Sequence, residues 1–196
     1  MSQRTVAILV FDDVEVLDFA GPYEVFNVAG ELGEGSPFSV FSVGVTSAPA
    51  VGRGGFTVQP TYSIDDAPPS DVLVVPGGAG TRPLLKDGRL IAWLRERGAE
   101  VEVLLSVCTG ALLLGAAGLL ERKSATTHHD AFDELAALSP TTHVVRGQRF
   151  VRSDERTVTS AGVSAGVDAS LYVVQELTGA ETRERTVAEM EWMWQS

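Results

Sequence analysis

The sequence predicts an α/β fold of three layers, in which helices cover both faces of a mostly parallel central sheet. Short apolar segments alternate along the chain with longer segments of helical periodicity, and Gly- or Pro-rich turns separate them. The predicted strands are apolar almost throughout, which is typical of parallel strands buried on both faces. The 196 residues contain no repeat or linker, so we expect a single domain, residues 1–196.

In the first half of the chain, short apolar segments predict strands and amphipathic segments predict helices. Residues 5–11 form a short apolar run and predict a buried first strand. Residues 21–32 place Val25 and Phe26 on one face of a helix, and Pro22 suits the first turn of that helix. The further elements predicted here are strands at 38–45, at 56–59 (weaker, in a Gly/Pro-rich stretch) and at 71–75, and a helix at 84–97.

An uncharged stretch, residues 103–120, is long enough to suggest a membrane span. Its first part is β-branched and Leu-rich, its last part is rich in Leu, Ala and Gly, and Cys108-Thr109-Gly110 lies between them. We therefore interpret it as a buried strand at 101–107, a sharp turn and a buried helix at 109–120, and expect no membrane partner. The remaining predicted elements are strands at 124–127, 142–145, 149–151 and 157–159 and helices at 131–138, 164–177 and 182–194.

Charge and cysteine content limit the possible partners and compartments. The chain has 26 acidic and 15 basic residues, for a formal net charge of −11. Such a surface repels phosphate backbones, so we expect no nucleic-acid partner. The apolar run near the N-terminus is too short for a secretory signal, and the one cysteine cannot form an internal disulfide. Both observations favour a cytoplasmic location.

Residues with chemical potential follow three of the predicted strands. In open α/β sheets, ligands bind at the carboxyl ends of the strands. Asp18 follows the first strand, Gly77 and Gly78 follow the strand at 71–75, and Cys108 follows the strand at 101–107. A cysteine on a tight strand-to-helix turn is presented outward, and we expect the N-terminus of the next helix to depress the pKa of its thiol. The alternative is that Cys108 is a small buried hydrophobe.

The groups expected around the thiol each allow two interpretations. The amides of Gly77 and Gly78 would bind negative charge that develops on a substrate, or they belong to a bare turn. Asp18 lies between apolar residues, so we expect desolvation to raise its pKa and to suit it for acid–base chemistry. His128 either approaches the thiol or is a structural histidine. The pair His128-His129 has no further ligand at a suitable spacing, so we predict no metal site.

Taken together, these segments resemble the ThiJ/PfpI superfamily, of class I glutamine amidotransferase-like fold. The Cys108-Thr109-Gly110 turn and the Asp18-x-x-Gly21-Pro22 pattern look most like isonitrile (isocyanide) hydratases and the ligand-sensing domains of some AraC-type regulators. The resemblance covers most of the chain. Its matching segments are residues 17–26, 75–80, 106–111, 114–120, 125–128 and 160–168.

The resemblance implies a flavodoxin-like three-layer sandwich and a homodimer. It also implies that Cys108 is a nucleophile, that the Asp18 carboxyl group meets the thiol, and that Thr109 supplies a backbone N–H and a hydroxyl near them. The protease branch of the superfamily has His where this chain has Thr109, so we expect no peptidase activity. AraC-type regulators carry a C-terminal helix-turn-helix domain, for which we expect no room in a chain that ends at Ser196, so we expect no direct transcription-factor function.

Three functions are compatible with this thiol and acid. The first is hydration of an isonitrile, a small electrophilic substrate, through a thioimidate on Cys108, with Asp18 as acid and base and without metal or organic cofactor. The second is glyoxalase-like or deglycase-like chemistry on α-oxoaldehydes. The third is a non-enzymatic redox or ligand sensor whose thiol oxidises to a sulfinate.

The C-terminal segment is unusually rich in large apolar side chains. Met190, Trp192, Met193 and Trp194 lie within five residues. Such a cluster either forms part of a dimer interface, where aromatic residues and Met are enriched, or packs on the core of its own chain.

Overall fold

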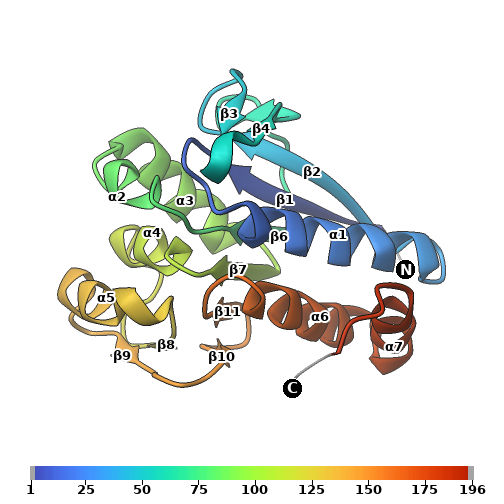
Figure 1. Cartoon of the computed structure of the whole chain (residues 1–196). Coiled ribbons are helices and arrows are strands. Elements are labelled where there is room, and N and C mark those ends of the chain that lie inside the picture. The colour runs from blue at the N-terminus through green and yellow to red at the C-terminus, as the bar shows by residue number, and fades with distance from the viewer. Residues whose placement is uncertain (1–2, 194–196) are drawn as a thin grey trace.

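The computed structural model describes residues 3–193, which form a seven-stranded sheet between two layers of helices (Figure 1). The strands of this sheet are β1 (Arg4–Val10), β2 (Phe38–Gly44), β5 (Tyr62–Ser63), β6 (Val72–Val75), β7 (Val103–Val107), β10 (Phe150–Arg152) and β11 (Thr157–Ser160). Their order is β10-β11-β7-β6-β1-β2-β5, and every neighbouring pair is parallel except β10 and β11. The predicted three-layer, mostly parallel α/β fold is therefore confirmed.

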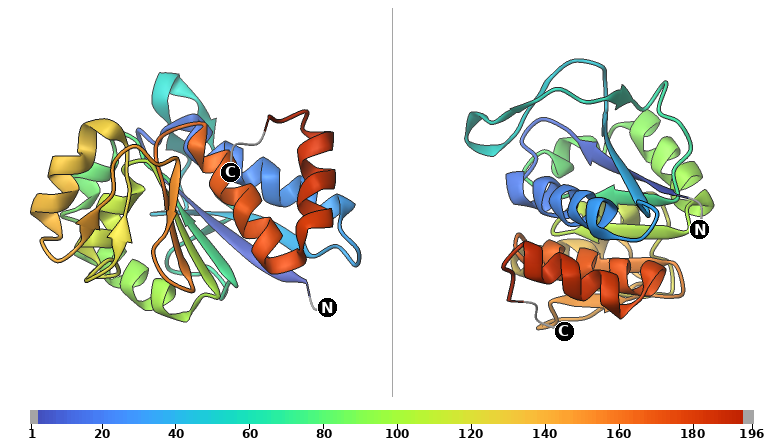
Figure 2. Two further views of the ribbon diagram at one scale, coloured as in Figure 1. Left: turned by 90° about the horizontal axis from the view of Figure 1, so that it is seen from below. Right: turned by 90° about the vertical axis from the view of Figure 1, so that its right-hand side faces the viewer.

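Helices cover both faces of the sheet (Figure 2). One layer contains α1 (Val16–Leu32), α6 (Ala165–Thr178) and α7 (Ala180–Glu189), which contact one another. The other layer contains α2 (Thr81–Leu84), α3 (Gly88–Glu100), α4 (Gly110–Ala116) and α5 (Phe132–Leu138). Because β7 contacts both α4 and α6, every residue of this strand is buried, as the apolar segment predicts. None of the helices among residues 3–193 is long and apolar enough to cross a membrane.

Small pieces of structure lie outside the main sheet. The predicted strand at 56–59 is present as β4 (Thr57–Val58), which pairs antiparallel with β3 (Ala50–Val51) around the 3₁₀ turn η1 (Arg53–Gly55). The strands β8 (Ser124–Ala125) and β9 (His143–Val144) form a separate parallel pair. A second 3₁₀ turn, η2 (His129–Ala131), joins β8 to α5.

The first helix begins earlier than the sequence predicts. We expect a helix from residue 21 with Pro22 in its first turn, but α1 starts at Val16 and contains Pro22 in its interior. Proline lacks only the amide that would bond to the carbonyl of Asp18, and burial of Val25 and Phe26 against the core holds the helix together. Asp18 therefore lies in the first turn of a helix and not in the preceding loop.

Three other predicted helices differ at their ends. The predicted helix at 84–97 is α3, which starts later, at Gly88, since Asp87 caps it by accepting hydrogen bonds from the amides of Arg89 and Leu90. The predicted helix at 109–120 ends at Ala116, before Gly118 adopts a φ of +76°. The predicted helix at 182–194 is α7, which ends at Glu189.

The strand order creates a crevice between β1 and β6. The chain leaves β1 through α1 toward β2, whereas β6 leads to β7 on the opposite side of the sheet. Connections that diverge in this way leave an opening at the carboxyl ends of the strands, where α/β proteins bind ligands. A bridge between Val14 and Gly78 joins the segments that follow the two strands, with Glu15 N–H donating to Gly77 O at 2.9 Å. We therefore expect a ligand-binding site at the carboxyl ends of β1 and β6.

Candidate functional site

Cys108 lies on a sharp turn directly after β7, as the sequence predicts. Its φ is +56°, a left-handed conformation that costs about 1–2 kcal/mol in a non-glycine residue. Hydrogen bonds on both sides of the residue hold it there. Its N–H donates to the carbonyls of Ser160 and Ala161 at 3.1 and 3.2 Å, and its own carbonyl accepts from the Thr127 hydroxyl at 2.8 Å. The surrounding loops thus impose the conformation of the cysteine.

The glycine loop after β6 packs directly against this turn. A Cβ atom at Gly77 would lie 2.8 Å from Cys108 Cβ and 2.5 Å from the Thr109 nitrogen. Real Cβ atoms do not approach so closely, so a larger residue would push the two turns apart. Gly78 has a φ of +131°, a conformation that only glycine adopts readily. The glycines therefore allow close approach of two backbones.

Asp18 is fully buried beside the cysteine. Its Oδ2 accepts a hydrogen bond from Gly77 N–H at 3.1 Å, and its Oδ1 accepts one from Val163 N–H at 3.0 Å. The Cys108 thiol forms a further hydrogen bond with the same carboxyl group. Loops after β6, β7 and β11 therefore converge on one carboxylate at the start of α1.

The environment of Asp18 makes it a proton carrier near neutral pH. Burial raises its pKa to about 6, even though the hydrogen bonds from the Cys108 thiol and from the amides of Gly77 and Val163 act in the opposite direction. The predicted increase in pKa is therefore present, and its cause is complete rather than partial burial. Such a group gains and loses protons easily at physiological pH.

The pKa of the Cys108 thiol differs from the sequence prediction. We expect the N-terminus of α4 to depress its pKa, but burial and then the charge of Asp18 raise the pKa of Cys108 to about 12. A hydrogen bond from the Thr109 N–H acts in the opposite direction and is outweighed, and α4 has only seven residues. Burial thus raises the pKa of both members of the pair, and the thiol remains the weaker acid of the two.

The amides of the glycine loop already have partners within the protein. Gly77 N–H donates to Asp18, and Gly78 N–H donates to the hydroxyl oxygen of Thr109 at 2.9 Å. The same hydroxyl oxygen accepts a hydrogen bond from Thr81 at 3.2 Å. Binding of a substrate anion by Gly77 and Gly78 stays a prediction, and it requires these internal bonds to break.

His128 approaches the thiol, which was one of its two predicted interpretations. A Cβ atom placed on Gly162 would lie 2.4 Å from His128 Cδ2 and 3.4 Å from Cys108 Sγ, so the imidazole edge and the sulfur border the same glycine. Burial, and then the charge of His129, lower the pKa of His128. The ring is therefore a neutral neighbour of the thiol at pH 7.

Two contributing residues were not identified from the sequence. Val163 adopts a φ of +55° and thereby directs its amide at Asp18, while Gly162 leaves room for His128. Both act through the backbone, so their side chains carry no chemical signal. Two signals were available: both residues follow a predicted strand at 157–159, at the same edge of the sheet as the other groups, and both lie in the matching segment 160–168.

The C-terminal aromatic cluster packs on its own chain where the structure describes it. Trp192 packs against the core and its Nε1 donates to Asp168 Oδ1 at 2.8 Å. Met190 also packs against the core, whereas Met193 is 87% exposed. Trp194 lies outside the described residues. For Trp192 and Met190, the intramolecular interpretation is thus confirmed.

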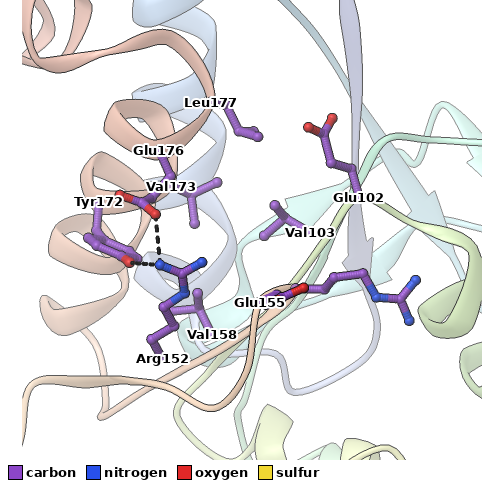
Figure 3. Close-up of a pocket in the computed structure, with 10 residues that line it drawn as sticks. Glu102, Val103, Arg152, Glu155, Val158, Tyr172, Val173, Glu176 and Leu177 are labelled. Carbon is purple, nitrogen blue, oxygen red and sulfur yellow. Dashed lines mark hydrogen bonds and ion pairs between the residues drawn. The ribbon is translucent and has the colours of Figure 1, made fainter.

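A separate cavity of about 160 Å³ lies at the opposite end of the sheet (Figure 3). Glu102 and Val103, at the amino end of β7, form part of its wall, and Arg152 there is hydrogen-bonded to Tyr172 and Glu176. Since Cys108 follows the carboxyl end of β7, this cavity is not part of the site described above.

Potential metal ligands gather next to the site. Among residues 3–193, one group of three side chains brings its ligand atoms within 4.8 Å of one another, namely His128, His129 and Asp130. No residue around Cys108 and Asp18 belongs to a further group of this kind in the described chain.

Comparison with known proteins agrees with this geometry. The chain is 36% identical over 190 residues to an isonitrile hydratase of Pseudomonas putida, a match that covers 95% of this chain and 78% of that protein. It is 22% identical to the HTH-type transcriptional regulator GbdR of Pseudomonas aeruginosa, covering 91% of this chain but 48% of the regulator. The crystal structure of a ThiJ/PfpI family protein from Pseudomonas syringae superposes with a TM-score of 0.87 at 31% identity, over 100% of this chain and 78% of that one.

The resemblance inferred from the sequence is thereby confirmed. The model of the DJ-1/PfpI family matches residues 4–176, which contain Asp18, Cys108 and every loop that converges on them. The chain belongs to the DJ-1/PfpI family.

Proposed function

We propose that this protein is a cysteine-dependent hydratase that converts an isonitrile into an N-substituted formamide. The observation that carries the proposal is the hydrogen bond between the Cys108 thiol and the buried Asp18 carboxylate. The identity of 36% with an isonitrile hydratase supports the choice of substrate class.

In the first half of the reaction, the pair adds across the terminal carbon of the isonitrile. Asp18 accepts the thiol proton while the sulfur forms a bond to that carbon. The protonated carboxyl group then delivers the same proton to the carbon. The product is a thioimidate, R–N=CH–S–Cys108, and Asp18 is again a carboxylate. Because the pKa of Asp18 is about 6, both transfers are accessible at neutral pH.

In the second half, water adds to the C=N bond of the thioimidate. Asp18 removes a proton from the water as the water oxygen bonds to carbon, and then passes that proton to the nitrogen. Collapse of the tetrahedral intermediate forms the C=O bond and breaks the C–S bond, while Asp18 takes up the proton of the hydroxyl group. Asp18 returns this proton to the sulfur, and R–NH–CHO is released. The overall reaction is addition of one water molecule, without oxidation or reduction.

The surroundings of the thiol favour an isonitrile over the other candidates. Cys108 is only 6% exposed, which suits a narrow, unhindered terminal carbon. An α-oxoaldehyde develops an alkoxide on attack and needs free donors, but the Gly77 and Gly78 amides already have partners. A redox-sensing cysteine is accessible to solvent, whereas Cys108 is buried.

A substrate panel tests the proposal. Purified protein is incubated with an alkyl isonitrile, with methylglyoxal or with hydrogen peroxide, and products and protein adducts are followed by mass spectrometry. We expect formamide from the isonitrile, and loss of more than about 10³-fold of this turnover in Cys108→Ala, because the covalent route is removed. Circular dichroism checks that the variant folds. Turnover of methylglyoxal alone, or stoichiometric oxidation of Cys108 without turnover of any substrate, would contradict the proposal.

We also propose that the protein is a homodimer in the cytoplasm. The family resemblance supports dimerisation, and the exposed apolar side chains of Leu17, Tyr23 and Val163 lie on α1 and on the loop before α6. The lone free thiol supports a reducing compartment. Light scattering at micromolar concentration tests the assembly, and a mass of 20.8 kDa would contradict it.

A further inference from the structure

A second chemical feature lies on the segment between β8 and α5, beside the thiol. Asp130 Oδ1 is 3.1 Å from His129 Nε2, and Asp130 Oδ2 is 3.9 Å from His128 Nδ1. The two imidazole rings face each other with their centroids 4.2 Å apart. Ligand atoms around one metal ion are separated by similar distances, because each lies about 2.0–2.2 Å from the metal.

The segment that carries these side chains is anchored to the core at its start and closed by a turn. Before it, Thr126 N–H donates to Thr159 Oγ1 at 2.9 Å, and the Thr127 hydroxyl donates to the Cys108 carbonyl at 2.8 Å. After it, Ala131 N–H donates to the His128 carbonyl at 2.9 Å and closes the 3₁₀ turn. Thr126 and Thr127 are fully buried. The backbone that presents the three ligands is therefore anchored to the core, which lowers the entropic cost of binding.

We propose that His128, His129 and Asp130 bind a divalent transition-metal ion at the rim of the Cys108 site. Two imidazoles and one carboxylate suit Zn²⁺, Ni²⁺ or Cu²⁺, whereas Ca²⁺ and Mg²⁺ prefer sites made only of oxygen. The prediction from the sequence was that no metal site exists, because adjacent histidines alone are insufficient. The 3₁₀ turn changes this, since it folds Asp130 back onto both rings.

The metal would use the outer edge of His128. Nδ1 of this ring accepts a hydrogen bond from Asp130 N–H at 3.3 Å, beyond the usual range, so a metal ion displaces a weak contact. The opposite edge carries Cδ2 and borders Gly162 and the thiol. Metal on Nδ1 leaves the ring proton on Nε2, next to Cδ2, and so fixes the tautomer that faces the thiol. The side chains of His129 and Asp130 are each 75% exposed, which leaves the ion open to solvent and to water as a further ligand.

Metal binding itself provides the test, so the result does not depend on the proposed activity. Zn²⁺ is titrated into the apo protein against a chromogenic chelator, and Cu²⁺ is examined by electron paramagnetic resonance. We expect one equivalent to bind, with a Cu²⁺ spectrum that shows two imidazole nitrogens. His129→Ala and Asp130→Asn should each weaken Zn²⁺ binding by more than about tenfold.

The chain offers two matched controls. His143, the third histidine, is exposed on β9, outside the three-residue group, so His143→Ala should leave the affinity unchanged. Cys108→Ala should also leave it unchanged, because the thiol is not a ligand in this proposal. Equal weakening by His143→Ala, loss of binding in Cys108→Ala alone, or no stoichiometric binding to the wild-type protein would each overturn the proposal.

Discussion

Asp18 and Asp154 are two aspartates with similar backbone partners and opposite chemistry. Asp18 accepts N–H bonds from Gly77 and Val163, and burial raises its pKa to about 6. Asp154 accepts N–H bonds from Arg156 and Thr157, and burial also acts to raise its pKa. In that case, however, those bonds and the ammonium group of Lys123, which lies 2.6 Å from the carboxylate, lower the pKa to about 2.

The difference shows what sets the protonation of the site. Two backbone amides are insufficient to keep a fully buried carboxyl group acidic, whereas a cation and partial exposure to water are sufficient to do so. Among residues 3–193, none of the groups that shift the pKa of Asp18 is a cation, and the side chain that forms a hydrogen bond with it is the Cys108 thiol. The site therefore contains a carboxylate that can exchange a proton with sulfur, and the turn at Asp154 contains one that stays ionised.

The largest expected effect separates the two aspartates by activity. Asp18→Asn should lower isonitrile turnover by roughly 10²–10⁴-fold, because an amide keeps the volume of the side chain but cannot accept the thiol proton. Asp154→Asn is the matched control and should leave turnover within about twofold, since it lies on the turn between β10 and β11. Steady-state kinetics at pH 7 measure both. Equal turnover in Asp18→Asn and wild type would remove Asp18 from the mechanism.

A smaller loss is expected from a glycine beside the thiol. In Gly162→Ala the new methyl group would lie 2.4 Å from His128 Cδ2, so the imidazole beside Cys108 must shift away from residue 162. Displacement near a reacting group costs up to about 10²-fold in rate. Gly88→Ala serves as a control for general effects of adding a methyl group, because its Cβ would meet no atom within 4 Å and its φ is not positive. Full activity in Gly162→Ala would show that the position of His128 is unimportant.

Thiol reactivity should change in the opposite direction from turnover. The charge of Asp18 raises the pKa of Cys108, so Asp18→Asn should shift the alkylation profile to lower pH, with roughly tenfold faster alkylation per unit of pKa. Iodoacetamide labelling across pH 6–11 measures this shift. In the wild-type protein, the rate should still be rising above pH 9. A plateau below pH 8 would contradict the raised pKa.

The parts of the fold that were predicted correctly are those fixed by burial along the chain. The strands predicted at 5–11 and 101–107 match β1 and β7 to within two residues at each end, because continuous apolar runs have few alternatives in a three-layer fold. β5 was missed, since two residues at the edge of a sheet give no apolar run. The start of α1 was placed too late because Pro22 is equally compatible with a first turn.

Some residues of the site were predicted from the sequence and others were not. Asp18 and Cys108 were predicted because each carries a reactive side chain in a segment that follows a strand. Val163 was not, because it contributes only an amide and a left-handed φ, which depend on the loop around it. The pKa of the thiol was predicted in the wrong direction, since the sequence indicates the helix that follows Cys108 but not the burial of its sulfur.

The smallest expected effect is on the free energy of unfolding, and it tests the difference between Asp154 and Asp18. The pKa of Asp154 is about 2 in the folded chain against an ordinary value of 3.8, so its ionised form stabilises the fold above pH 4, and this contribution is lost as the pH falls toward 2. The side chain is 38% exposed, so solvent screening limits the contribution to about 1 kcal/mol. Asp154→Asn should therefore lower the free energy of unfolding at pH 7 by about this amount, and by less at pH 3.

The contribution of Asp18 to stability has the opposite sign, because its pKa in the folded chain is raised. Ionisation of its carboxyl group between pH 4 and 6 therefore opposes folding. Urea unfolding at pH 7 and pH 3 measures both aspartates. A loss in Asp154→Asn that is equal at the two pH values would mean that the carboxylate charge contributes nothing there, and that only the shape of the turn matters.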